Sequence, residues 1–179
     1  MTPVDILNDE YQSIVRFLNE SAQPSLSSDV NKYFKKVIIL SSASYFEHRI
    51  QGLLVEFVTQ KANSDIRVLS FFKKKAIEMK YHTYFNWGEK YNPEKPGKNA
   101  NMFFSLFGED FKKKTEEIIN NSPELNTAMK AFLEIGHLRN ILVHSNFAAY
   151  NFDNKTTEEI VTLYRKGLLF IDFIQKILD

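Results

Sequence analysis

The sequence predicts an all-α fold, a helical bundle of five to seven helices. Apolar residues recur at helical spacing through most of the chain, and the periodic segments begin at recognisable N-cap residues. No stretch shows the sustained two-residue alternation that is typical of a half-buried strand. The chain has only 6 Gly and 5 Pro against 16 Phe and 8 Tyr, which favours long regular elements packed through bulky side chains.

The first two predicted helices are joined by a short linker. Thr2 is the expected N-cap of the first helix, with Pro3 at the first helical position, and residues 21–25 form the turn-rich linker that ends it. The second helix is expected to start at Ser28 or Asp29 and to be the longest of the chain. Its apolar stripe consists of Ile39, Ala43, Phe46, Ile50, Leu53, Leu54 and Phe57.

Several short elements are expected in the middle of the chain. Residues 63–65 form a cap cluster before a helix with apolar residues at helical spacing over 66–79. Residues 86–100 contain Trp, Gly and Pro without a sustained period, which predicts the one long loop. Two short helices are then expected, over about 102–107 and 111–119.

The last two predicted helices have the clearest start signals. Ser122-Pro123-Glu124 supplies an N-cap, a proline at the first helical position and an acid in the first turn. After a polar loop over 145–155, Thr156 and Glu159 form a capping-box pattern before a helix that runs nearly to Asp179. The expected apolar stripes are Ala128, Phe132, Ile135, Leu138 and Leu142 in the first helix, and Ile160, Tyr164, Gly167, Ile171, Ile174 and Leu178 in the second.

The composition is typical of one soluble globular domain, which we expect to span residues 1–179. A net charge of +1 means that any nucleic-acid binding must come from a local patch. The absence of Cys excludes disulfides and thiol nucleophiles and suits a reducing cytoplasm. Neither a signal-peptide pattern nor an apolar run of about 18–20 residues occurs, so we expect a cytoplasmic protein without a membrane partner.

The sequence contains no motif that indicates a cofactor or a metal ion. It lacks a phosphate-binding loop, a dinucleotide-binding glycine fingerprint and a His-Glu-x-x-His pair. His137 and His144 share a helix face, but their separation of roughly 10 Å is too long for one zinc ion. We therefore expect neither a cofactor nor a metal site.

Two lysine triplets, at 73–75 and 112–114, have two interpretations. Each is expected to form a solvated helix face, and the alternative is a local surface for an anionic ligand, because clustered lysines attract phosphate. The neighbouring aromatic residues Phe71, Phe72 and Phe111 are expected in the core.

Residues 136–145 place a guanidinium, an amide and an imidazole near the end of one helix. On an ideal helix Arg139 and His144 point about 140° apart, whereas Asn140 and His144 differ by only about 40°. Arg139 also falls near the apolar stripe of its helix. A purely structural interpretation therefore makes Arg139 the partly buried partner of an acid such as Glu47, and His144 a polar helix terminator.

This arrangement resembles the HEPN superfamily (higher eukaryotes and prokaryotes nucleotide-binding), small α-helical domains with an Arg-x4–6-His motif. Here the motif runs from Arg139 to His144, with a polar residue directly after the arginine. Residues 44–50, which include Glu47, resemble the acidic segment that many members carry in their long helix. The match covers roughly residues 30–178 and is closest to the bacterial subfamilies RiboL-PSP-HEPN and MAE_28990-type HEPN.

The resemblance implies a metal-independent endoribonuclease that acts on RNA as a toxin or phage-defence effector. Attack of the ribose 2′-OH on the adjacent phosphodiester would leave a 2′,3′-cyclic phosphate. In this scheme His144 transfers a proton and Arg139 braces the phosphorane. Asn140 would orient the imidazole or a phosphate oxygen, and Glu47 would position the guanidinium or a water. The family also implies a homodimer, and an antitoxin or regulatory protein as partner.

Two arrangements can bring Arg139 and His144 together. Either the helix breaks before His144, or Arg139 of one subunit meets the imidazole of the other across a two-fold axis. Two other functions stay open. One is a catalytically inactive HEPN-like module that binds RNA, a nucleotide or a partner protein, and the other is a structural helical adaptor.

The remaining histidines have weaker interpretations. His137 is expected on the surface, and His48 is expected to face away from the apolar stripe of the long helix. Tyr81, His82 and Tyr84 stand just before the long loop, which is a candidate for the rim of a substrate site.

Overall fold

The structure, a computed structural model, describes residues 1–90, 92–148, 150–152 and 155–179. Within this part of the chain it contains seven α-helices, short 3-10 and π-helical segments and no strand, which confirms the all-α prediction. The helices are α1 (Pro3–Glu20), α2 (Pro24–Lys61), α3 (Ile66–Phe72), α4 (Asn101–Phe104), α5 (Glu109–Asn120), α6 (Pro123–His144) and α7 (Thr157–Leu178). No described helix is both long enough and apolar enough to cross a membrane.

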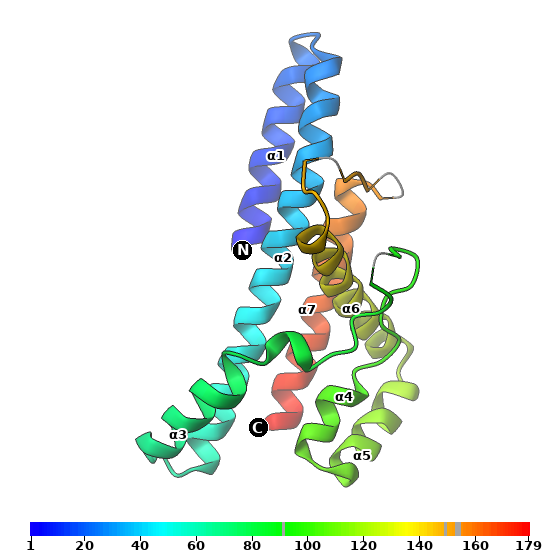
Figure 1. The fold of residues 1–179 in the computed structure, drawn as a ribbon. Coiled ribbons are helices and arrows are strands. Elements are labelled where there is room, and N and C mark those ends of the chain that lie inside the picture. The colour runs from blue at the N-terminus through cyan, green and yellow to red at the C-terminus, as the bar shows by residue number, and fades with distance from the viewer. Residues whose placement is uncertain (91, 149, 153–154) are drawn as a thin grey trace.

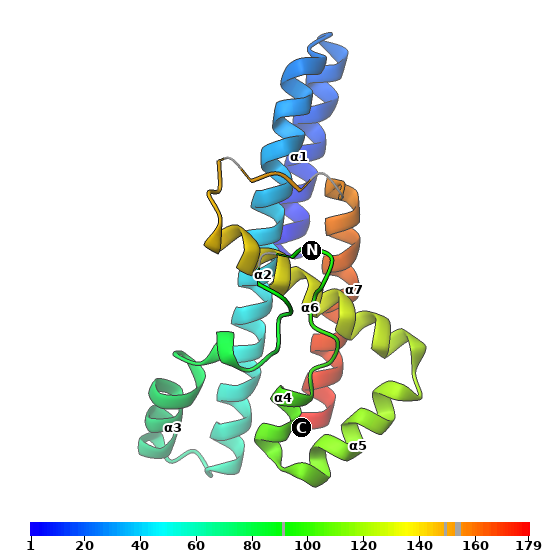
Figure 2. The ribbon, with the colours of Figure 1, turned by 45° about the vertical axis from the view of Figure 1, so that its right-hand side comes forward.

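Helices α2, α6 and α7 enclose the core. α1 and α2 form an antiparallel hairpin, α7 runs beside the lower part of α2, and α6 crosses both, while α3 and the α4–α5 pair lie at the end away from the hairpin turn (Figures 1 and 2). Phe46 of α2 stacks on Phe132 of α6 and on Tyr164 of α7, with ring centroids 5.1 and 5.4 Å apart. A Cβ at Gly167 would lie 2.6 Å from the Phe46 ring, so this glycine lets α7 approach α2 closely. The predicted apolar stripes of α2, α6 and α7 are buried, except for Phe57, which is half-buried.

The second helix begins earlier than the sequence predicted. α2 starts at Pro24, not at Ser28 or Asp29, so the linker shrinks to residues 21–23. A proline is well suited to the first helical position, because its missing N–H has no intrahelical acceptor there and its φ is already helical. Pro24 therefore begins the helix, whereas the sequence interpretation placed it in the linker.

The segment around α3 is less buried than predicted. Phe71 and Phe72 are 63% and 43% exposed, so their predicted place in the core was wrong; the half-buried Phe111 does pack against the core. α3 has no buried residue and passes directly into a π-helical turn, Lys73–Ile77, whose last residue is buried. α3 lies at the edge of the bundle, beside the end of α2, which leaves much of its surface, Phe71 and Phe72 included, open to solvent (Figures 1 and 2).

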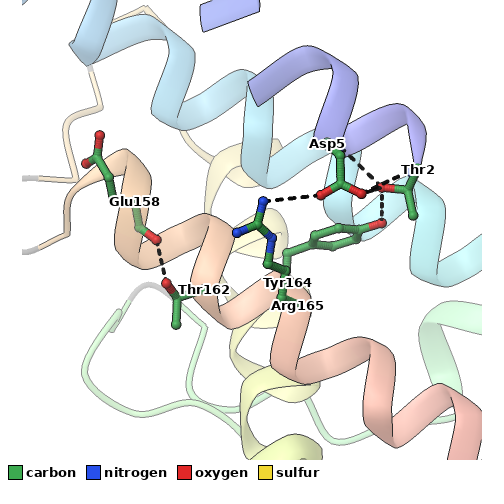
Figure 3. A network of polar contacts seen from close by, with 6 residues as sticks. All are labelled: Thr2, Asp5, Glu158, Thr162, Tyr164 and Arg165. Atoms are coloured by element: carbon green, nitrogen blue, oxygen red, sulfur yellow. Dashed lines mark hydrogen bonds and ion pairs between the residues drawn. The ribbon is translucent and has the colours of Figure 1, made fainter. Parts of the chain in front are cut away.

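The beginning of α1 is fastened to α7 by a polar network (Figure 3). Thr2 and Asp5 form a capping box, in which the Asp5 carboxylate accepts hydrogen bonds from the Thr2 backbone N–H at 2.9 Å and the hydroxyl at 2.8 Å. The Tyr164 hydroxyl donates to Thr2 Oγ1 at 2.9 Å, and the Arg165 guanidinium lies 3.5 Å from the Asp5 carboxylate. Burial raises the pKa of Tyr164 to about 12, so this hydroxyl stays a donor at neutral pH.

Two lysines of α2 hold the loop that follows α6. Lys35 Nζ donates to the carbonyl of Phe152 at 2.7 Å, and Lys36 Nζ donates to the carbonyl of Phe147 at 2.6 Å. Lys36 is 1% exposed, and burial, together with the neighbouring lysines, lowers its pKa. The predicted polar loop over 145–155 is confirmed for its described residues, while positions 149, 153 and 154 lie outside them.

Candidate active site

A cavity of about 140 Å³ lies between α2, α6 and the segment that precedes the long loop. Three of the four predicted site residues, Glu47, Arg139 and Asn140, line it, although they come from helices far apart in the sequence. The complete lining is Ala43, Phe46, Glu47, Tyr81, His82, Trp87, Phe132, Gly136, Arg139 and Asn140. The cavity therefore has aromatic walls and a cluster of polar groups that includes both a cation and a carboxylate.

The charged groups of the cavity are held by neutral partners. Arg139 Nη1 donates to Asn140 Oδ1 at 3.2 Å, and Gln51 Nε2 donates to Glu47 Oε1 at 3.3 Å. Among the described residues no ion pair joins Arg139 to a carboxylate, so the direct Arg139–Glu47 pair of the purely structural interpretation is not formed. A guanidinium has five N–H donors, and among the described residues one of those on Arg139 donates a hydrogen bond, which leaves others for an anionic ligand in the cavity.

Tyr81 lies next to both charged groups. Its side chain is buried, and this burial raises the pKa of the phenol far above its usual value. The Glu47 carboxylate raises that pKa further, and the Arg139 guanidinium opposes the effect. At neutral pH the Tyr81 hydroxyl is thus a hydrogen-bond donor rather than a base.

His144 lines a second, wider pocket. α6 continues unbroken to its last residue, His144, and Ser145 is its C-cap, so the helix break considered from the sequence does not occur. The pocket, of about 610 Å³, shares Asn140, His82 and Trp87 with the first cavity. Arg139 thus faces the first cavity and His144 faces the second pocket, because a step of five residues on a continuous helix turns the two side chains about 140° apart.

Gly136 and Trp87, which the sequence interpretation did not assign to the site, form part of its wall. A Cβ on Gly136 would lie 2.0 Å from a carbon of the Trp87 ring, so the indole packs directly against the α6 backbone. Trp87 Nε1 also donates to the carbonyl of His82 at 3.0 Å. A glycine inside a helical pattern is a known sign of close packing, and this signal was present in the sequence.

His137 is buried, so its predicted surface position was wrong. Its side chain is 1% exposed, and Nε2 donates to the backbone carbonyl of Asn92 at 2.7 Å. The predicted long loop over 86–100 covers this histidine, and Gly97 N donates to the carbonyl of Trp87 at 2.9 Å where the loop closes on itself. His137 thus fastens the long loop to α6.

The residues just before the long loop differ in their position relative to the pockets. Tyr81 and His82 line the first cavity, whereas Tyr84 is buried and its hydroxyl donates to the carbonyl of Ala76. His48 is exposed, as predicted, and lies outside both pockets. The 3-10 turn Tyr81–Thr83 and the first residues of the long loop together border the two pockets.

The lysine triplets lie outside both pockets. Lys73 pairs with Glu78 at 3.6 Å and Lys112 pairs with Glu109 at 3.3 Å, in exposed or partly exposed positions. These contacts suit the interpretation as solvated helix faces. A phosphate-attracting role for the triplets stays a prediction.

An all-α bundle with an Arg-x4-His sequence on one helix, beside a glutamate of the longest helix, is the arrangement that the resemblance to HEPN domains implies. The chain belongs to the RiboL-PSP-HEPN family, whose profile matches residues 5–179. No curated protein and no solved structure matches the chain. Family membership indicates a HEPN-type nuclease or another RNA-related function, and it favours the first of the two subfamilies suggested by the sequence.

Proposed function

We propose that this protein is a metal-independent endoribonuclease that works as a homodimer in a toxin–antitoxin or phage-defence system, with residues 1–179 as one HEPN-like domain. The observation that best supports the proposal is the shared cavity of Glu47, Arg139 and Asn140. Its guanidinium has no carboxylate partner among the described residues, and the pocket of His144 adjoins it through Asn140. A cation without an ion pair beside an imidazole suits a phosphodiester substrate.

The reaction needs only proton transfer and charge stabilisation. The ribose 2′-oxygen attacks phosphorus, the O2′–P bond forms and the P–O5′ bond breaks. The products are a 2′,3′-cyclic phosphate and a free 5′-hydroxyl. His144 transfers a proton in this reaction, because an imidazole exchanges protons near neutral pH.

The other site residues act on charge and orientation. Arg139 keeps its charge and stabilises the extra negative charge of the phosphorane through paired N–H donors. Asn140 lies between the two hollows, where its amide orients a phosphate oxygen or His144. Glu47 orients a water or a ribose hydroxyl beside the guanidinium.

Dimerisation completes the site in this proposal. Arg139 and His144 of one chain line different hollows, so one chain alone does not direct both groups at the same phosphate. A two-fold axis next to the end of α6 would place His144 of the partner subunit opposite Arg139. RNA is the substrate, and the family resemblance adds an antitoxin or regulatory protein as a partner.

The test is RNA cleavage by the purified protein in the presence of EDTA. We expect cleavage with 2′,3′-cyclic phosphate ends, and a loss of at least about 100-fold in kcat/KM for Arg139→Ala and for His144→Ala. His48→Ala is the matched control, because it removes an exposed imidazole outside both pockets.

Two results would contradict the proposal. One is equal cleavage by the wild type and both site variants, which indicates a contaminating nuclease. The other is RNA binding without cleavage, which indicates the inactive binding module.

A further inference from the structure

His82 is a second imidazole beside the proposed site, and it lies outside the Arg-x4-His motif. It lines the cavity that holds Arg139 and Glu47, and it also lines the pocket that holds His144. Among the described residues, it is the one histidine of the four that lines both the first cavity and the second pocket.

The backbone of His82 is fixed while its side chain is exposed. Its carbonyl accepts the hydrogen bond from Trp87 Nε1 at 3.0 Å, and the Trp87 ring packs on Gly136 of α6. The preceding residue, Tyr81, is buried in the cavity wall. The 3-10 turn is therefore anchored to the same helix that carries the motif, and it presents the His82 imidazole at the mouth of the site.

The proposed reaction requires two proton transfers on opposite sides of phosphorus. One proton leaves the 2′-oxygen as O2′–P forms, and one proton must reach the 5′-oxygen as P–O5′ breaks. In an in-line displacement these oxygens lie on opposite sides of the phosphorus atom, so one imidazole does not serve both. Arg139 does not lose its proton, and the raised pKa of Tyr81 keeps its phenol from acting as a base.

We propose that His82 is the second proton-transfer residue of this site and shares the two transfers with His144 of the partner subunit, which the proposed dimer places opposite Arg139. The neutral imidazole of the pair takes the proton from the 2′-oxygen, and the protonated imidazole gives its proton to the 5′-oxygen. After one turnover the two histidines have exchanged protonation states, and solvent restores them. This assignment rests on the proposed function.

The measurement is kcat/KM against pH for cleavage of a short RNA oligonucleotide by the 179-residue chain. We expect a bell-shaped profile for the wild type, since one imidazole must be neutral and the other protonated. His82→Gln should lower the maximum by about 100- to 10,000-fold and remove one limb of the bell. His48→Gln is the matched control and should keep both limbs.

Other groups around the two pockets are candidates for the second limb. The titratable and charged ones are Glu47, Tyr81, Lys90, His137 and Arg139. His137 is buried against Asn92, Tyr81 is buried in the wall and Arg139 does not lose its proton, which leaves the Glu47 carboxylate and the Lys90 ammonium as the competitors. Glu47→Gln should therefore lower the rate and keep both limbs.

A second substrate separates proton transfer from positioning. A nucleoside 3′-(4-nitrophenyl phosphate) has a leaving group that needs no proton. If His82 protonates the 5′-oxygen, His82→Gln should lose far less activity on this ester than on RNA. If His82 is the base, both substrates should lose activity, and His82→Gly should recover with added imidazole.

The outcomes distinguish this inference from the proposed function. An active wild type whose bell is unchanged in His82→Gln overturns the role of His82 alone. That role is also overturned if activity is lost with the fold intact and neither the ester nor imidazole restores it, or if Glu47→Gln removes the limb. A wild type that cleaves no RNA overturns the proposed function, and the role of His82 with it.

Discussion

Gly136 shows how one missing side chain shapes the site. The Trp87 indole lies where a Cβ at position 136 would be, 2.0 Å from the nearest ring carbon. Trp87 in turn bonds to the carbonyl of His82 and lines both pockets. A larger side chain at position 136 should therefore displace the indole and so alter the lining of both pockets.

We expect Gly136→Ala to lower the free energy of unfolding by about 1–3 kcal/mol, because the methyl group forces the indole away from the helix. Trp87 is the only tryptophan of the chain, so its fluorescence reports the displacement directly. Urea unfolding and the emission maximum are the measurements, and we expect a shift to longer wavelength as the ring moves toward water.

Gly52→Ala is the control for this prediction. Nothing lies within 4 Å of a Cβ at Gly52, which is exposed within α2. Alanine should therefore stabilise the helix by roughly 0.5–1 kcal/mol, with no change in fluorescence. Equal stabilisation by both substitutions would show that the indole does not pack on α6.

His137 is a residue whose burial the sequence did not predict. Its helix and its face were predicted, but its burial was not, because the covering loop comes from residues about 45 positions earlier. Arg139 and Asn140 could be selected as candidates from the resemblance of their motif. Their shared cavity with Glu47 could not be predicted, since it depends on how α2 and α6 cross.

At the scale of the element, the capping box of α1 predicts a pH dependence. The hydrogen bonds from Thr2 lower the pKa of the Asp5 carboxyl below its ordinary value, and Arg165 adds to this effect. A carboxyl whose pKa is lower in the folded state contributes stability above its unfolded pKa, near 3.9, and loses it as pH falls through the folded pKa.

We therefore expect Asp5→Asn to lower the free energy of unfolding at pH 7 by about 0.3–1 kcal/mol. The difference from the wild type should shrink as pH falls below about 4 and vanish below the folded pKa of Asp5. Urea midpoints between pH 2 and pH 7 measure it. Asp9→Asn removes the same charge from the same helix outside the capping box, and a similar pH-dependent loss there would count against a specific role of the cap.

Element boundaries were predictable where a local signal decides them. The capping residues Thr2, Ser122 and Thr156 each accept the hydrogen bond expected of an N-cap. The start of α2 at Pro24 and the π turn after Phe72 were missed. At Pro24 a residue that usually interrupts a helix begins one, and after Phe72 the helix continues with a wider turn. A search for helix-breaking residues misses the first, and a fixed 100° period misses the second.

At the scale of the whole molecule, the proposed division of the site between two subunits predicts complementation between inactive variants. If Arg139 of one subunit acts with His144 of the partner subunit, a mixed dimer of Arg139→Ala and His144→Ala has one intact site. Random exchange makes about half of the dimers mixed, so about a quarter of the wild-type activity should return. The measurement is RNA cleavage after the two variants are mixed and allowed to exchange subunits.

A site contained in one chain gives the opposite result. Every chain in the mixture then carries one defect, and activity should stay at the level of the separate variants. Analytical ultracentrifugation of both variants is the necessary check, because a monomeric protein would contradict the dimer as well.

The sequence by itself determined the helical class, the start of most helices, the apolar stripes of α2, α6 and α7, and the resemblance to the HEPN superfamily that the family match bears out. These properties depend on the spacing of apolar residues and on the helix caps, and both are determined by residues close together in the sequence.

Only the tertiary structure decided which residues far apart in the sequence line the same cavity. The crossing of α2 and α6 brings Glu47 to Arg139, and the long loop buries His137 and seats Trp87 on Gly136. The same packing places His82 at both pockets. The physical reason is that burial and juxtaposition come from contacts between elements, which the spacing of residues along one helix does not encode.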